Sequence, residues 1–516
     1  MTKLRHLRSL ARIPQQQFWS GTADKLPPRC LSVDPYCTSS GPADDGFPGA
    51  MELWTWGKGE FGQLGLGDEE TRRFPYPLKS LHLPLSSAVA PAEGLLNYST
   101  RERRPSPQPV ENSYSTKRMN FQERRGNEEC QSAVSGSKPF VRPMHISPRA
   151  GVGGGVGIAC GLFHSGLWVD GQLWLWGKGS GGRLGLGSEE PEYNPTHVSS
   201  LRDVTSVSLG GLHSAAIAGG NLYTWGFGGF GALGHGNYSK QTLPKQLCGE
   251  DWMENVKAVS AGGSHTAVIS STGELYTWGR DEGEGRLGHG AGGGADEGAE
   301  PFPIKVEALP IPVAAVACGG FCTMALTPVG QLWSWGGNSN FELGRGNRQD
   351  DWRPKPIPAI ETTRIIQVAC GGYHAAALTD DGQMLTWGHG GHGQLGHGSL
   401  QNGRVPSVVE ALANERVVSI SCGSSWTAAV TESGELYTWG KNRDSQLGVP
   451  SLKDTQMTPS LVTFEDVESN GDTQSTFPHI MCVTAGSTHG TALVYRTTRR
   501  VCSSISKEGR KDPLTY

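Results

Sequence analysis

Short apolar runs alternate along most of this chain with glycine-rich turns. Thr266–Ile269 and Leu275–Trp278 are two such runs, and a turn at Gly273 and Glu274 separates them. Two short β-prone runs that are joined by a Gly-containing turn predict a β-hairpin. Because the repeated segments show no sustained 3.6-residue apolar period, we expect strands and turns there and no helices.

The predicted hairpins carry two marks that recur at intervals of about fifty residues, as in repeat proteins. The first mark is a Trp-Gly dipeptide, present seven times, at Trp56, Trp176, Trp225, Trp278, Trp335, Trp387 and Trp439. The second is a Gly turn that leads into a strand, also present seven times, at Cys160–Ser165, Gly210–Ser214, Gly262–Thr266, Gly319–Thr323, Gly371–Ala375, Gly423–Thr427 and Gly486–Gly490.

The phase of these marks predicts a closed ring. The first complete mark is Trp56-Gly, the later half of a repeat, and the last is Gly486–Val494, the earlier half. Pairing of the two halves would leave no free sheet edge at the seam. We therefore predict an all-β fold over residues 51–495: a seven-bladed β-propeller that is closed by pairing of the N- and C-terminal half-repeats.

Both marks resemble the regulator of chromosome condensation repeat family, which includes the plant UV-B photoreceptor. Trp56–Gly65 and Trp225–Gly234 each match the family run Trp-Gly-x-Gly-x-x-Gly-x-Leu-Gly in full. The resemblance covers residues 51–495 apart from one insertion. It implies a propeller whose loop-lined faces bind partner proteins.

The segments outside the repeats differ in composition. Residues 1–23 contain Lys3, Arg5, Arg8 and Arg12 and no acidic residue, which is typical of a mitochondrial transit peptide. A flexible basic tail is the alternative. Residues 24–50 are predicted to be a flexible linker, and residues 496–516 a basic C-terminal tail.

Residues 85–155 account for the unusually long interval between Trp56 and Trp176. This stretch has no Trp and neither repeat mark, and it is rich in Arg, Ser and Pro. We expect a disordered basic insertion in the first blade. It is either an arm that contacts RNA or an unspliced or misannotated exon.

The overall charge and hydropathy of the chain argue against two classes of protein. A formal net charge of −4 argues against a globally basic nucleic-acid binder, although one face can still be basic. No apolar run approaches the length that spans a membrane. We expect a monomer without a membrane span.

Four runs of the form Gly-x-Gly-x-x-Gly invite a dinucleotide-binding interpretation: Gly57–Gly62, Gly177–Gly182, Gly226–Gly231 and Gly388–Gly393. Such a site needs a helix directly after the glycines. Here another turn follows, as in Gln63-Leu-Gly65, so we expect these glycines to form tight turns. No cofactor-binding residue is predicted.

The repeated polar residues do not form a recognisable catalytic or metal set. His164, His213, His265, His374 and His489 occupy one repeat position, but Cys322 and Trp426 interrupt the series. We expect these histidines to hold their own turns by hydrogen bonds. Four cysteines at another position are expected to be small buried residues: Cys160, Cys318, Cys370 and Cys422. A solvated loop is the expectation for His389, His392 and His397. We predict no catalytic residue and no metal ligand, and we expect the tryptophans to pack between blades.

Three functions fit the family resemblance. One is guanine nucleotide exchange on a small GTPase, as in the founding member, with a nuclear or cytosolic location. The second is UV-B reception, but that branch repeats Gly-Trp-Arg-His-Thr, whereas Leu162 and Phe163 precede His164 here.

The third function is a non-catalytic scaffold in the mitochondrial matrix, because the chain resembles the plant mitochondrial branch of the family. That branch implies organelle RNA processing, namely group II intron splicing of complex I transcripts together with protein splicing factors, and so complex I biogenesis. Whether RNA is contacted directly stays open. Four loops are expected to share one binding face: Gly226–Phe230, Arg280–Glu284, Asn338–Phe341 and Lys441–Arg443.

Overall fold

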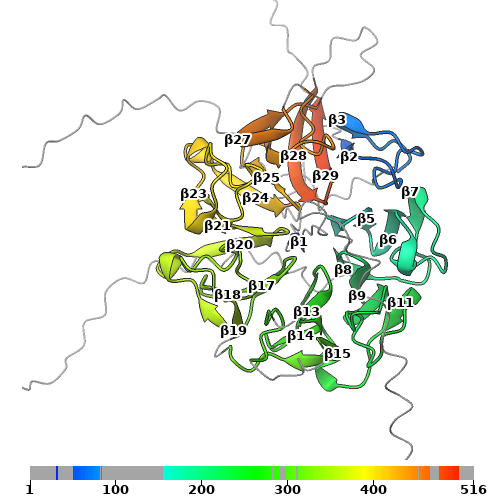
Figure 1. Cartoon of the computed structure of the whole chain (residues 1–516). Helices are drawn as coiled ribbons and strands as arrows, with labels where there is room; N and C mark the ends of the chain where they lie inside the picture. Colours follow the sequence, from blue (N-terminus) through cyan, green and yellow to red (C-terminus); the bar gives the residue numbers. More distant parts are fainter. Residues whose placement is uncertain are drawn as a thin grey trace, which may run out of the picture.

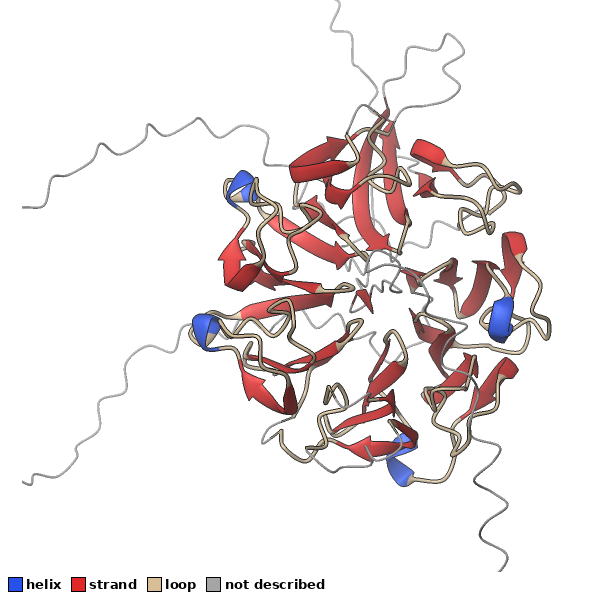
Figure 2. Ribbon diagram, viewed as in Figure 1, coloured by secondary structure: helices blue, strands red, loops and turns tan. Residues whose placement is uncertain are grey.

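The protein folds into seven antiparallel β-sheets that are arranged as blades around a common axis (Figure 1). The computed structural model describes residues 31–32, 50–81, 83, 155–281, 284–290, 298–309, 312–450, 453–464 and 476–498. Across these ranges strands and turns dominate, and the only helices are short 3-10 turns (Figure 2). The predicted seven-bladed β-propeller is confirmed.

Six blades are built from four strands that follow one another in sequence and pair in hairpin order. Their strands are β4 Val156–Cys160, β5 His164–Val169, β6 Gln172–Gly177 and β7 Glu192–His197; β8 Val204–Leu209, β9 His213–Ala218, β10 Asn221–Gly226 and β11 Gln241–Gln246; β12 Ala258–Ala261, β13 His265–Ile269, β14 Leu275–Arg280 and β15 Ala299–Lys305; β16 Ala315–Cys318, β17 Cys322–Leu326, β18 Leu332–Gly336 and β19 Asp351–Pro356; β20 Ile365–Cys370, β21 His374–Thr379, β22 Met384–Gly388 and β23 Gly403–Val408; and β24 Val417–Cys422, β25 Trp426–Thr431, β26 Leu436–Lys441 and β27 Thr455–Val462. The 3-10 turns are η3 Ser180–Gly182, η4 Asp251–Met253, η6 Pro358–Ile360 and η7 Glu410–Leu412.

The seventh blade joins the two ends of the chain. It consists of β28 Thr476–Ala485, β29 His489–Thr498, β2 Ala50–Gly57 and β3 Arg72–Pro77, in that order. β2 and β29 pair along their whole shared length, with Gly57 opposite His489 and Trp54 opposite Ala492. The predicted closure by half-repeats is therefore confirmed. β29 continues to Thr498, past the expected boundary at residue 495.

The structure places two segments differently from what the sequence predicted. The insertion expected within the first blade leaves after β3, the outer strand of the closing blade, and the chain resumes at β4, the inner strand of the next. It therefore connects two blades and interrupts neither. Apart from Gly155, residues 85–155 lie outside the described residues. β1, Leu31–Ser32, lies within the segment expected to be a linker, yet it pairs with β20 near the ring axis (Figure 1).

Burial decreases from the inner strands of each blade to the outer one. The second strands are buried throughout, as in β21, whose sequence His-Ala-Ala-Ala-Leu-Thr has small side chains that let the neighbouring blades approach closely. The outer strands expose alternate residues, as β23 does. The hydrophobic core is thus distributed over the interfaces between blades.

The Trp-Gly tryptophans lie in these interfaces, as predicted, and all seven are fully buried. Six donate an indole N–H to a carbonyl of the preceding blade, at 2.8–3.0 Å, for example Trp225 to Arg183 and Trp439 to Gln394. These bonds fix both the packing and the register of adjacent blades, since a buried indole N–H needs an acceptor.

A β-bulge marks the same tryptophan in every blade. The pairing of the third and fourth strands shifts register there, as between Thr224 and Gly226. The next residue has a φ near +100°, for example +107° at Gly226, where a Cβ would lie 2.7 Å from His213 Cα. Only glycine satisfies both conditions, so the Trp-Gly pair redirects the chain from strand to face loop.

Candidate interaction face

Two loops from each blade meet on one face of the ring. One joins the first strand to the second and carries the Gly turn; the other leaves the third strand after Trp-Gly. A backbone hydrogen bond of 2.8–2.9 Å ties the two loops in every blade, as from Lys178 N–H to the Phe163 carbonyl. We name the residues so joined the inner rim: Lys58, Lys178, Phe227, Arg280, Gly337, His389 and Lys441, with Thr488, Phe163, Leu212, Ser264, Phe321, Tyr373 and Ser425.

The four loops that were expected to share a face all belong to this arrangement. Gly226–Phe230, Arg280–Glu284, Asn338–Phe341 and Lys441–Arg443 follow the third strands β10, β14, β18 and β26, although residues 282–283 lie outside the described ranges. Successive strands of a blade are antiparallel. Loops after every third strand therefore leave the ring on the same side.

Half-buried aromatic rings and cations alternate along part of the inner rim. Phe61 and Phe163 meet edge to face with ring centroids 5.3 Å apart, and Lys178 Nζ lies 4.1 Å from the Phe61 centroid. Phe321 stacks on Tyr373 at 4.9 Å. Arg280 lies 4.7 Å over Phe230. A cation over an aromatic face is attracted by the ring quadrupole.

Two arginines lie beneath the rim, at the position where three blades have glutamine. Arg286 is buried and donates to Glu284 at 2.7 Å and to the Gly320 carbonyl at 3.2 Å. Arg183 is also buried, and its partners among the described residues are the carbonyls of Ser180 and Gly211, to which it donates at 2.9 and 3.0 Å. Burial lowers the pKa of Arg183 to about 10, so its guanidinium stays charged at neutral pH.

The repeated histidines hold their own turns through the backbone, because each histidine carbonyl accepts from the first glycine of its turn, as His164 does from Gly161 at 2.9 Å. Their side chains also link neighbouring blades, which the sequence did not predict. Each donates from Nε2 to a hydroxyl of the next blade at 2.8–3.0 Å: His164 to Ser214, His213 to Thr266, His265 to Thr323, His374 to Thr427 and His489 to Ser165. The hydroxyl donates in turn to a carbonyl of the histidine's own blade, as Thr427 does to Gln394. The partner lies one repeat away, so no local pattern reveals it.

His374 and His489 are neutral structural groups. Burial lowers the pKa of His374 and of His489 to about 3. Because the hydroxyl proton points to the carbonyl, the imidazole must carry its own proton on Nε2. The bond from His489 to Ser165 crosses the seam between the closing blade and the next, so it also supports ring closure.

The other polar candidates have local partners. Cys160, Cys318, Cys370 and Cys422 are buried free thiols, as expected, and burial raises the pKa of Cys318 to about 12. In the expected solvated loop, His389 accepts from Gln394 at 2.9 Å, and His397 lies 3.0 Å from Thr386 Oγ1. Within the described ranges no three His, Cys, Asp or Glu residues are grouped so that they could hold a metal.

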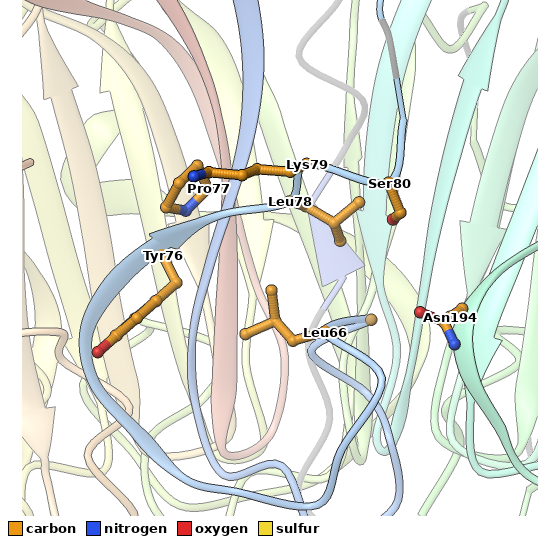
Figure 3. A pocket seen from close by; sticks show the side chains of 8 residues that line it. Leu66, Tyr76, Pro77, Leu78, Lys79, Ser80 and Asn194 are labelled. Carbon is orange, nitrogen blue, oxygen red and sulfur yellow. The ribbon is translucent and has the colours of Figure 1, made fainter. Parts of the chain in front are cut away.

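The glycines of the dinucleotide-like runs form turns, as predicted. Gly57, Gly62 and Gly65 all have positive φ, and no helix follows the first run. A small cavity of about 290 Å³ lies beside Gly65, between the closing blade and β7 (Figure 3). Leu66 and Leu78 face each other across it, and Asn194 comes from the next blade.

Comparison with known proteins identifies the family. The model of the RCC1-like domain matches residues 126–492, and that of the regulator of chromosome condensation (RCC1) repeat matches residues 52–87. The mitochondrial RCC1 domain-containing protein RUG3 of Arabidopsis thaliana is 43% identical over 465 residues, which are 88% of this chain and 91% of the relative. The chain belongs to the RCC1 family.

More distant members share the same propeller. The ultraviolet-B receptor UVR8 of Arabidopsis thaliana is 34% identical over 336 residues, which cover 63% of this chain and 74% of the receptor. Yeast RCC1 (Prp20), solved bound to Kap60, is 18% identical, with a TM-score of 0.62 over 92% of this chain and 91% of that one. At this identity the likeness shows the fold alone. Among the described residues no helix is long and apolar enough to cross a membrane.

Sequence reasoning found the loops of this RCC1-type face but missed part of its chemistry. Phe163, Phe321 and Tyr373 belong to the Gly turns, which lie at a different phase of the repeat from the Trp-Gly loops. The backbone bond that joins the two loops sets them side by side. A comparison of both phases for aromatic residues would have found them.

Proposed function

We propose that this protein is a non-catalytic RCC1-type scaffold that works in the mitochondrial matrix and supports RNA processing there. The observation that carries the proposal is the 43% identity to a mitochondrial relative over nearly the whole length of both chains. The basic, acid-free residues 1–23 support the same location. The finer role that we propose is group II intron splicing of complex I transcripts, and hence complex I biogenesis.

The arrangement of the inner rim supports a binding role. Side chains of seven blades converge on one face, and their backbone is fixed by hydrogen bonds at 2.8–2.9 Å. A rigid, preorganised face costs little conformational entropy on binding. Such a face suits a protein that holds splicing factors or RNA in place.

The alternative is guanine nucleotide exchange on a small GTPase. Its support is the shared fold with yeast RCC1, together with the solved structure of Prp20p from Saccharomyces cerevisiae, which was described with its binding properties to Gsp1p and histones. The two proposals differ in what the face binds and in where the chain acts.

Affinity purification of the tagged full chain from mitochondria separates the proposals. We expect intron-containing complex I transcripts and splicing proteins to be enriched, and unspliced precursors to accumulate when the gene is disrupted. A chain without residues 2–23 is the control for location and should stay outside mitochondria. Unchanged splicing together with accelerated nucleotide release from a GTPase would instead support the exchange factor.

A further inference from the structure

A group of aromatic and cationic side chains lies on, beside and just beneath the inner rim where the closing blade meets the next two. It comprises Phe61, Phe163, Lys178, Arg183, Phe227 and Phe230, and we name it the Lys178 arc. These residues come from the closing blade, from the β4–β7 blade and from the β8–β11 blade. The face loops hold all of them, so segments far apart in sequence build the arc, with Arg183 buried beneath its other members.

The aromatic part of the arc offers ring surfaces at its two ends. Phe61 and Phe163 form one edge-to-face pair, and Phe227 and Phe230 form another with centroids 5.3 Å apart at 76°. All four rings are half-buried, so each is held by the fold and still reaches solvent. Between the pairs, Gly181 takes the position that Phe61 and Phe230 occupy in their blades, and its backbone approaches Phe227 so closely that an added Cβ would lie 3.2 Å from the Phe227 Cβ.

The charged part of the arc is cationic without a matching acid. The Lys178 ammonium lies over the rings of Phe61 and Phe163, 4.1 and 5.3 Å from their centroids. The Arg183 guanidinium is bonded to two carbonyls and no acid. In the described part of the chain, neither cation has a carboxylate within the 4.0 Å of an ion pair. Burial and then the charge of Arg183 lower the pKa of Lys178.

Two carboxylates on the same face are already paired with other cations. Glu60 forms an ion pair with Lys58 at 2.5 Å, although its charge also reaches Lys178. Glu189 accepts from the Gly181 amide and pairs with Lys240. Two cations that repel each other, with Glu60 offsetting only part of the Lys178 charge, favour an anion nearby. The geometry therefore calls for a ligand that brings both negative charge and flat apolar surfaces.

We propose that the Lys178 arc binds single-stranded RNA. Phosphates would contact Lys178, with the charge of the buried Arg183 adding to the attraction from beneath, and unpaired bases would stack on the phenylalanine rings. Stacked aromatic side chains along a cationic groove are the usual means by which proteins hold single strands without sequence preference. An acidic protein segment would use the cations but would leave the rings without planar partners. This inference rests on the proposed function, because it names the partner that the face would hold.

Fluorescence anisotropy with a labelled single-stranded oligouridylate of about 20 nucleotides tests the arc in the full chain. We expect Phe61→Ala, Phe163→Ala and Lys178→Ala each to weaken binding about tenfold, within the usual range for a lost base stack. Lys178→Ala should also reduce the slope of log K against log salt by about 0.7, the value for one phosphate of a single strand. Phe61→Trp and Lys178→Arg should bind like the wild type.

Matched controls lie on the opposite face. Arg202 and Lys257 are exposed and lie in the connections that lead into β8 and β12. Arg202→Ala and Lys257→Ala should change the affinity less than twofold. Because every chain retains residues 85–155, any binding by that segment is common to all and cancels in the comparison. Thermal unfolding of each variant confirms that it is folded.

Three results would overturn the arc: equal affinity of the arc and control variants, competition by polyglutamate as strong as by unlabelled RNA, or no RNA binding by the wild-type chain. The second result would show that the surface takes an acidic protein. The broader function is tested separately. If the Phe61→Ala, Lys178→Ala double variant loses RNA in vitro but still restores splicing in mitochondria, RNA binding by the arc stands and the proposed function does not depend on it. If neither the wild-type chain nor the double variant binds RNA and splicing is normal, only the arc is wrong.

Discussion

At the scale of single residues, the side chains at one repeat position can be compared between the seven blades. Beneath the inner rim, Gln63, Gln394 and Gln446 each accept from a backbone amide two residues before them, at 2.8–3.0 Å. Glu342 makes the same bond at 2.7 Å, to Asn340. A buried carboxylate thus makes the hydrogen bond that a glutamine side-chain amide makes in three other blades. Burial raises the pKa of Glu342 to about 7, with a smaller contribution from the charge of Glu284.

We predict that Glu342→Gln stabilises the protein at alkaline pH. The folded pKa is raised, so the glutamic acid stabilises the fold below its unfolded pKa, and that contribution is lost as pH rises through 7. The glutamine keeps the acceptor and does not titrate. Urea unfolding should therefore show an increase of about 1–3 kcal/mol at pH 8.5 and little change at pH 4.5. The same increment at both pH values would exclude ionisation of Glu342 as the cause.

At the scale of elements, the Trp-Gly turn is tightly constrained in each blade. Gly440 has a φ of +113°, and a Cβ there would lie 2.6 Å from the Ser425 carbonyl oxygen and 2.6 Å from Trp426 Cα. Both contacts are to backbone, so neither can be relieved by a rotamer change. Gly219, by contrast, has a φ of +56° and nothing within 4 Å of the added atom.

We predict that Gly440→Ala destabilises the protein by about 3 kcal/mol or more, because strain in φ and a backbone clash add together. Gly219→Ala introduces only the strain of a positive φ and should lower the free energy of unfolding by about 1 kcal/mol. Denaturant midpoints of the two variants measure the difference. Equal costs would mean that the turn can move away from the second strand, contrary to the close packing between them.

The elements themselves could be predicted from the sequence because the two marks recur at fixed positions in each repeat. Trp56 and His489 are separated by nearly the whole chain, yet their positions within the period place them on paired strands, as β2 and β29 are. What could not be predicted depends on contacts between repeats. The hydroxyl that His374 reaches belongs to the next blade, and the pairing of Phe61 with Phe163 follows from how the blades pack.

At the scale of the whole molecule, stability depends on the ring being closed. The core is divided among the interfaces, and each interface is held by buried tryptophans and, in five places, by a histidine bonded to the next blade. In an open array the two end blades would each expose one of these interfaces. The closing blade removes both ends at once, so its contribution exceeds that of its own four strands.

We predict that a chain that ends after residue 475 fails to fold cooperatively, whereas one that ends after Thr498 behaves like the wild type. The shorter chain lacks β28 and β29, so β2 loses its partner strand and Trp426 loses the Gly486 carbonyl to which it donates at 2.9 Å. It would also expose the interface at Ser165, where His489 closes the ring. Calorimetry should show a broad or absent transition for the shorter chain and a single sharp one for the longer. A sharp transition in both would mean that six blades suffice, and that the seam pairing of the two ends is a consequence of folding and not a condition for it.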